Sequence, residues 1–202
     1  MLVNRQTDRQ AISNHDVERG TPFLAMSLSM LSTRLRSLFW LLSSVTTGAL
    51  TLMTSSRING ISRQELQDFL ATPTNWPRIV ASSHSVERVS NQVDTPLLPG
   101  EQVKEIFGFP PLLPLSVCWT CERNDDELLE FLAPEGLENV ARNCRMVFNF
   151  QEEQTKAVMV TLTMEFDPLS PIAIAALPLL TADNGIAMKL MLPLVSTTGT
   201  NK

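Results

Sequence analysis

The feature that most constrains the fold is a long stretch of alternating hydrophobicity followed directly by an apolar segment that contains prolines. Residues 115–166 read as four consecutive strands joined by short polar turns, and residues 168–195 read as a helix in two pieces. Strands joined by such short connections pair antiparallel. The helix must bury its apolar side against one face of their sheet. We therefore expect an α+β fold in which a curved antiparallel sheet of about six to seven strands wraps a long, broken C-terminal helix.

The last two strands show the clearest alternation. Residues 144–150 and 157–166 place apolar side chains at every second position, opposite Thr161, Thr163 and Glu165. This pattern indicates a sheet with one covered and one exposed face. The covered face and the helix that lies on it supply our candidates for the wall of a ligand cavity. They are Val117, Trp119, Met146, Phe148, Val160, Leu162, Met164, Ile186 and Leu190.

Before these strands, the sequence predicts a first strand over residues 46–58 and then two short helices. Ser62 and Glu65 form the pattern of a capping box, which marks the first residue of a helix. Pro73 ends that helix, because the residue before a proline resists helical geometry. A turn at residues 75–77 then leads to a second short helix near residues 78–82. Residues 85–91 and 102–107 read as further strands.

Charge is distributed unevenly along the chain. Residues 1–60 carry six Arg against three acidic residues, whereas residues 61–202 carry ten basic and eighteen acidic residues. An acidic body argues against nucleic acid as a partner, since phosphates require clustered Lys and Arg. The hydrophobic fraction of 44% is sufficient for a substantial core.

Residues 1–45 differ in composition from the rest and are interpreted as an N-terminal extension. Residues 21–44 are rich in Ser and Leu, contain Arg34 and Arg36, and lack acidic residues, which is typical of an organelle transit peptide. An interfacial helix that contacts a membrane and a disordered tail are the alternatives. We therefore expect an intracellular protein, in a chloroplast or other plastid or a mitochondrion, or alternatively in the cytoplasm. One domain over residues 46–196 and a tail over residues 197–202 complete the predicted organisation.

The cysteines and histidines do not form a recognisable catalytic or metal motif. Cys118 and Cys121 match the CxxC spacing, but residues three apart in a strand point to opposite faces. They therefore cannot easily share a metal ion or close a disulfide. His84 is interpreted as a solvated histidine at a strand edge. We predict no catalytic residue, no metal and no cofactor.

The order of elements resembles the polyketide cyclase/START-like superfamily, also called the SRPBCC or Bet v 1-like group. The resemblance is carried by residues 62–70 followed by Asn75-Trp76-Pro77, by Pro99-Gly100-Glu101 before a strand, by residues 128–137, and by residues 155–166 before a proline-rich helix. It covers roughly residues 46–195 and implies a helix-grip fold with a deep apolar cavity between the sheet and the last helix. The proline-interrupted last helix departs from the family pattern.

These observations support three hypotheses about function. The first is a non-catalytic, monomeric protein that binds or transports a hydrophobic small molecule such as a lipid or quinone. The second is an enzyme of the cyclase, aromatase or dehydratase type that uses the same cavity. It ranks lower, because few polar groups fall on the predicted inner face. The third is an organelle assembly factor.

Overall fold

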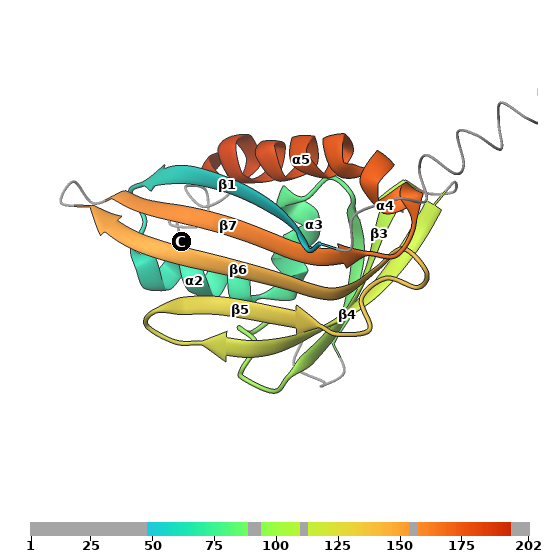
Figure 1. Ribbon diagram of the computed structural model, residues 1–202. Helices are drawn as coiled ribbons and strands as arrows, with labels where there is room; N and C mark the ends of the chain where they lie inside the picture. The colour runs from blue at the N-terminus through green and yellow to red at the C-terminus, as the bar shows by residue number, and fades with distance from the viewer. Residues whose placement is uncertain (1–47, 89–93, 110–112, 154–156, 195–202) are drawn as a thin grey trace, which may run out of the picture. The chain divides into compact units, whose positions relative to one another are not determined.

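The computed structural model describes residues 48–88, 94–109, 113–153 and 157–194. These residues form seven strands and a small set of helices (Figure 1). The strands are β1 Leu50–Asn59, β2 Ser83–Arg88, β3 Gln102–Phe109, β4 Leu113–Asn124, β5 Leu128–Ala133, β6 Ala141–Glu153 and β7 Ala157–Pro168. The helices are α2 Arg63–Ala71, η1 Pro73–Asn75, α3 Trp76–Ile79, α4 Pro171–Ala175, α5 Leu177–Ile186 and η2 Ala187–Met191.

All neighbouring strands pair antiparallel in one sheet of order β1-β7-β6-β5-β4-β3-β2. The chain places β1 and β2 at opposite edges, and α2 and α3 cross between them. Figure 1 shows the sheet curving, with α5 along one side and α2 and α3 behind the long strands. This arrangement is the helix-grip fold, so the predicted fold class is confirmed.

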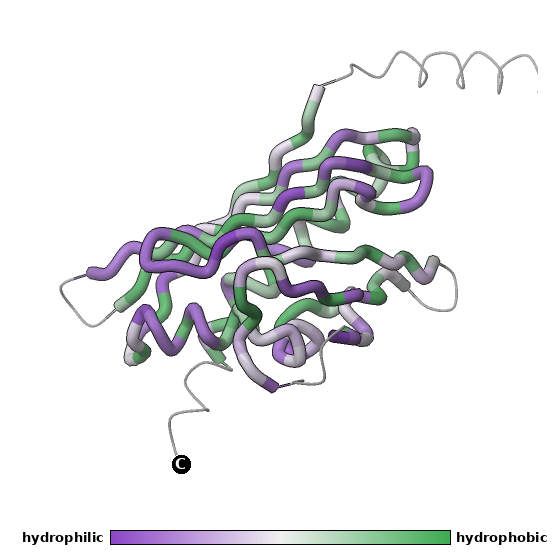
Figure 2. Tube along the Cα trace, turned by 90° about the horizontal axis from the view of Figure 1, so that it is seen from below, coloured by the Kyte–Doolittle hydropathy of each residue, from purple (hydrophilic) through white to green (hydrophobic). Residues whose placement is uncertain are grey.

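The long strands separate apolar from polar side chains as the sequence predicts, and the alternation can be followed in Figure 2. In β7, Val160 and Leu162 are buried, whereas Thr161 and Thr163 lie on the other face. The register places Leu162 opposite Phe148 of β6 and Met164 opposite Met146. Such cross-strand pairs of apolar side chains stabilise the sheet and form one wall of the interior.

Helix α2 begins at the predicted capping box. The Ser62 Oγ accepts a hydrogen bond from the Glu65 backbone N–H at 3.3 Å, and the Glu65 carboxylate accepts one from the Ser62 N–H at 2.9 Å. Its inner side buries Leu66 and Leu70. The next α-helix, α3, begins at Trp76, earlier than predicted, because Pro77 suits the first turn of a helix.

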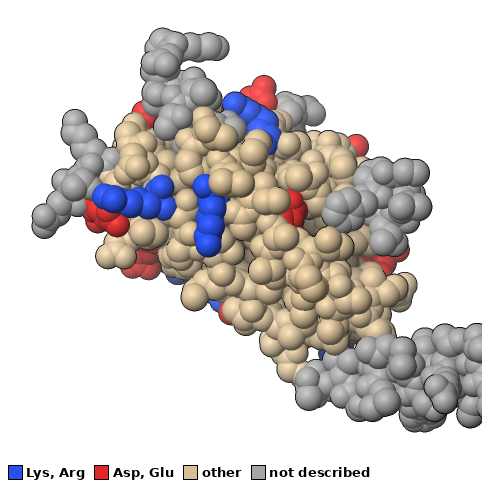
Figure 3. Space-filling model, turned by 90° about the horizontal axis from the view of Figure 1, so that it is seen from above, with Lys and Arg blue, Asp and Glu red and all other residues tan. Residues whose placement is uncertain are grey.

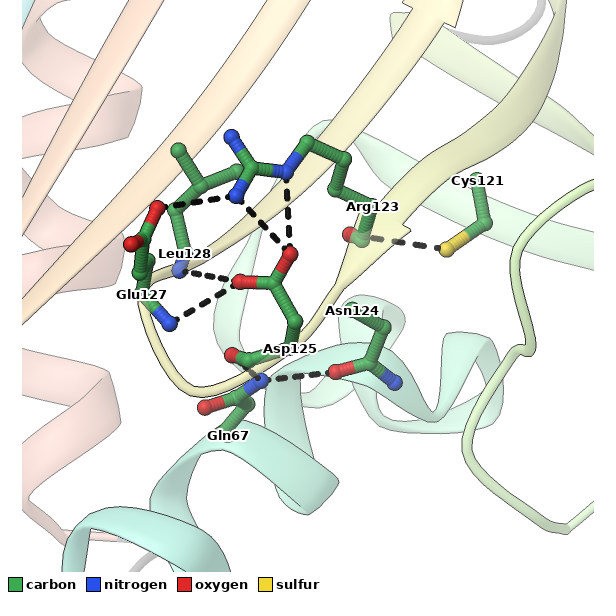
Figure 4. A network of polar contacts seen from close by, with 7 residues as sticks. All are labelled: Gln67, Cys121, Arg123, Asn124, Asp125, Glu127 and Leu128. Carbon is green, nitrogen blue, oxygen red and sulfur yellow. Dashed lines mark hydrogen bonds and ion pairs between the residues drawn. The ribbon is translucent and has the colours of Figure 1, made fainter.

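A polar network joins α2 to the turn between β4 and β5 (Figure 4). Gln67 donates to the Asn124 side chain at 2.7 Å and to the Asp125 carbonyl at 2.8 Å. The Asp125 carboxylate accepts a hydrogen bond from the Glu127 backbone N–H at 2.9 Å and pairs with Arg123. Hydrogen bonds from the backbone N–H groups of Glu127 and Leu128 hold the pKa of Asp125 below its ordinary value. The acidic residues at this turn therefore stabilise the turn itself.

The C-terminal helix is broken at Ala176, between α4 and α5, and then continues into η2. The sequence marks Pro178 and the Asn184-Gly185 pair as helix breakers; Pro178 lies in the first turn of α5, whereas the break expected at Asn184-Gly185 was wrong, because α5 extends through both residues. The inner side of the helix carries Ala residues interspersed with larger ones: Ala173, Leu177, Leu180, Asn184, Ala187, Met188 and Leu192. The outer side carries large exposed apolar residues: Ile172, Leu179, Ile186, Leu190 and Leu194. Figure 3 looks onto the face that carries α5 and shows few charged side chains there.

The predicted N-terminal extension, residues 1–45, and the tail, residues 197–202, lie outside the described residues. The start of the predicted first strand, residues 46–47, lies outside them as well, and β1 begins at Leu50. In the part of the chain that the structure describes, no helix is both long and apolar enough to cross a bilayer.

Candidate ligand cavity

Two adjacent cavities lie between the sheet and the last helix. The first cavity has a volume of about 90 Å³ and the second about 100 Å³. The first is enclosed by α2, α3, the central strands and α5 with η2. The second lies towards α4 and the start of β6. Their walls are mainly aliphatic, aromatic and Met side chains, so both cavities are suited to apolar groups.

A shared wall separates the two cavities. Phe107, Trp119, Met164 and Leu180 line both of them. Trp119 is held in place by a hydrogen bond from its Nε1–H to a Glu105 carboxylate oxygen at 2.9 Å. Met side chains adapt easily to neighbours of different shape. The wall therefore combines two aromatic rings, one of them held by a hydrogen bond, with the aliphatic Leu180 and the adaptable Met164.

The structure places most of the predicted cavity residues where the strand pattern put them. Six of them line one or both cavities: Val117, Trp119, Met146, Phe148, Leu162 and Met164. Val160 is fully buried and packs in the core without lining either cavity. Whether any of these side chains contacts a ligand stays a prediction.

The two residues predicted from the last helix were wrong. Ile186 is 44% exposed and Leu190 is 59% exposed, so both point away from the sheet. Ala187 and Met188 line the first cavity instead. Spacing alone identified a helical stripe, but two stripes of this helix are apolar. The prediction chose the stripe of Ile and Leu residues that is exposed, whereas the inner stripe mixes Ala with Leu, Asn and Met.

The first cavity has a polar end, which the sequence analysis did not identify. Glu105 from β3, Asp183 and Asn184 from α5, and Ser82 after α3 line it together. Ser82 donates a hydrogen bond to the Asp183 carboxylate. Asn184 donates to the Met164 sulfur at 3.1 Å. The sequence contains one signal of this polar end: the charged Glu105 shares one face of its strand with the apolar Val103 and Phe107.

Glu105 is the most perturbed carboxyl group of the cavity. It is 9% exposed, and removal from water raises its pKa above the ordinary value. The hydrogen bonds from Ser83 and Trp119 lower that pKa, whereas the negative charge of Asp183 raises it further. Glu105 is thus a buried carboxyl group whose pKa lies above its ordinary value.

The second cavity contains fewer groups capable of chemistry. Burial raises the pKa of the Cys144 thiol to about 11, which leaves it protonated and unreactive at neutral pH. The turn before β6 closes one end of this cavity through Leu137. That turn requires Gly136, because its φ is +60° and an added Cβ would lie 2.3 Å from the Ala141 carbonyl oxygen.

His84, Arg142 and Glu130 line neither of the two cavities. His84 is exposed and its Nε2 is 2.8 Å from the Gly108 carbonyl oxygen. Arg142 is exposed, and Glu130 pairs with Arg145 on the face of the sheet away from the helix. Cys118 is exposed while Cys121 is buried, on opposite faces of β4 as predicted.

Among the described residues, no group of three His, Cys, Asp or Glu side chains is arranged to hold a metal ion.

Comparison with known proteins provides structural relatives only. No family model matches the chain, and no curated protein matches it. A protein from Thermus thermophilus is similar with a TM-score of 0.61 and 12% identity, covering 75% of this chain and 100% of that one. An aromatase/cyclase from a Streptomyces species gives 0.61 and 10%, covering 74% and 94%. Norcoclaurine synthase from Thalictrum flavum, in complex with dopamine and hydroxybenzaldehyde, gives 0.58 and 12%, covering 94% and 100%. Identities this low establish the fold alone, and that fold is the one that the resemblance implies.

Proposed function

We propose that the protein binds a hydrophobic small molecule in the two cavities between the sheet and the last helix, without catalysing a reaction on it. The observation that carries this proposal is the inner side of that helix. Ala173, Ala176 and Ala187 line the cavities at positions where larger side chains would fill them. A helix that packed tightly on the sheet would place Leu or Ile at such positions, since protein interiors normally leave few voids.

Binding would be driven by the removal of apolar ligand surface from water, at roughly 25 cal/mol per Å² before ordering costs. The shared wall of Phe107, Trp119, Met164 and Leu180 sets the size of ligand that each cavity admits without rearrangement. A larger ligand would displace the aliphatic members of this wall and span both cavities.

The experiment uses the full chain and toluene as a small neutral probe. Calorimetric titration should give a Kd of about 1 mM or lower, the range accessible to a ligand of this size. Ala173→Leu and Ala187→Leu, which fill one cavity each, should abolish binding when combined. Ala182→Leu, on the exposed side of α5, is the matched control and should bind toluene normally.

Absence of toluene binding to the wild-type protein would contradict the proposal, as would unchanged binding to the double variant. Circular dichroism of each variant separates loss of binding from loss of the fold. Native mass spectrometry of the purified protein provides a second measurement, because a ligand that co-purifies is detected as added mass.

A second candidate function, an enzyme of the aromatase/cyclase type, is favoured by one observation. Glu105 is a buried carboxyl with a raised pKa inside the first cavity, and such groups serve as general acids in catalysis. We rank it second because Glu105 and Asp183 are the only titratable groups that line this cavity among the described residues.

A further inference from the structure

The polar end of the first cavity has an unbalanced charge. Glu105 and Asp183 both line it, and none of the described residues that line it is basic. In the described part of the chain, neither carboxylate belongs to an ion pair. Buried carboxylates in proteins are normally paired with a cation or held by several hydrogen bonds. Here the donors that face the two groups are all neutral: Trp119 and Ser83 for Glu105, and Ser82 for Asp183.

The two carboxyl groups come from opposite walls. Glu105 projects from β3 of the sheet, and Asp183 projects from α5 of the last helix. They are close enough for the charge of Asp183 to raise the pKa of Glu105. A positive charge placed between them would reverse this effect, since it would favour the ionised form of both groups. The remaining walls of the cavity are apolar.

We propose that Glu105 and Asp183 bind the protonated nitrogen of a hydrophobic amine, whose hydrocarbon part lies in the apolar remainder of the first cavity. This inference rests on the proposed function and specifies the chemical class of the ligand. Three features of the site correspond to parts of such a ligand. The carboxylates accept the N–H donors of an ammonium group, the aromatic and Met walls contact its chain, and the cavity volume limits the chain length.

The Trp119 hydrogen bond prepares Glu105 for this role. It fixes one carboxylate oxygen at 2.9 Å from the indole nitrogen and therefore fixes the direction of the other oxygen. Ser82 orients the Asp183 carboxylate in the same way. An ammonium group in this position would favour the ionised form of Glu105 and so oppose the effect of burial on its pKa.

The test compares three probes of equal chain length, namely hexylamine, 1-hexanol and hexanoate, titrated calorimetrically into the full chain at pH 7. Hexylamine should bind at least tenfold more tightly than 1-hexanol, and hexanoate should bind most weakly.

Two variants locate the effect. Glu105→Gln keeps an acceptor for Trp119 and Asp183→Asn changes a partly exposed position, so both are expected to fold. Each should reduce hexylamine affinity tenfold or more and leave 1-hexanol affinity unchanged. Glu87→Gln, at an exposed position of β2, is the charge-matched control and should retain the wild-type preference.

Failure of this inference differs from failure of the proposed function. If toluene and 1-hexanol bind but hexylamine has no advantage, or if Glu105→Gln keeps the advantage, the amine proposal is overturned and hydrocarbon binding stands. If neither toluene nor any of the three probes binds, both proposals are overturned.

Discussion

Strand β7 and the last helix face each other across the cavities, and they distribute their apolar residues differently. In β7 the larger apolar side chains, such as Leu162 and Phe166, point inward and are buried. In the helix, Ala187 points inward while Ile186 and Leu190 are exposed. The sheet side of the cavities is therefore lined by large side chains and the helix side partly by Ala, and space remains between them.

This difference teaches that the inward face of an element is not always its most hydrophobic one. An exposed Leu or Ile is common on protein surfaces, whereas an unfilled interior is rare. The helix is anchored on the sheet by Met188 and Leu192, which are almost fully buried. Its Ala residues are then free to leave space on either side of that anchor.

The largest expected effect on stability is in β7. Leu162→Asp would bury an unpaired carboxylate and should lower the free energy of unfolding by several kcal/mol, or unfold the domain. Thr163→Asp, the next residue on the opposite face of β7, should change it by less than about 1 kcal/mol. Urea denaturation of both variants measures the contrast. Equal stability of the two would show that the two faces of the strand do not differ as described.

A smaller effect is expected on the helix. Met188→Ala removes a buried anchor and should lower the free energy of unfolding by about 2–4 kcal/mol. Leu190→Ala, two residues away on the exposed side, should stay within about 0.5 kcal/mol of the wild type. Thermal and urea unfolding provide the measurement. A larger loss for Leu190→Ala than for Met188→Ala would reverse the assignment of the inner and outer sides.

The smallest contrast concerns the way the helices begin. Ser62→Ala removes the capping box of α2 and should lower the free energy of unfolding by about 1 kcal/mol. Ser170, which precedes α4, makes no capping hydrogen bond, and its buried hydroxyl has no partner among the described residues. Ser170→Ala should therefore be neutral or slightly stabilising. A clear loss of stability in Ser170→Ala would show that Ser170 caps α4 in the way that Ser62 caps α2.

The sheet and α2 could be predicted from the sequence because their signals are local. Period-two alternation assigned the faces of β6 and β7, and the Ser62 and Glu65 pair located the start of α2. The opposite faces of Cys118 and Cys121 followed from spacing alone. Each of these inferences needs only a few neighbouring residues.

The candidate site was predicted only in part, because it depends on distant segments. Glu105 and Asp183 are far apart in the sequence, and only the fold brings them to one cavity. The phase of the last helix is also a tertiary property. Local hydrophobicity favoured Ile186 and Leu190, and packing of Met188 and Leu192 against the sheet decided otherwise.

The wide turn of η2 has a consequence for chain length. The Leu192 N–H donates to the Ala187 carbonyl, five residues back, so this turn accommodates one residue more than an α-helical turn. Deleting an exposed residue within it, such as Lys189, would restore regular winding and still leave Leu192 facing the sheet. The same deletion in α5, for example at Ala182, would rotate every later residue by about 100° and turn Leu192 outward. The helix thus tolerates a change of length at one turn and not at the next.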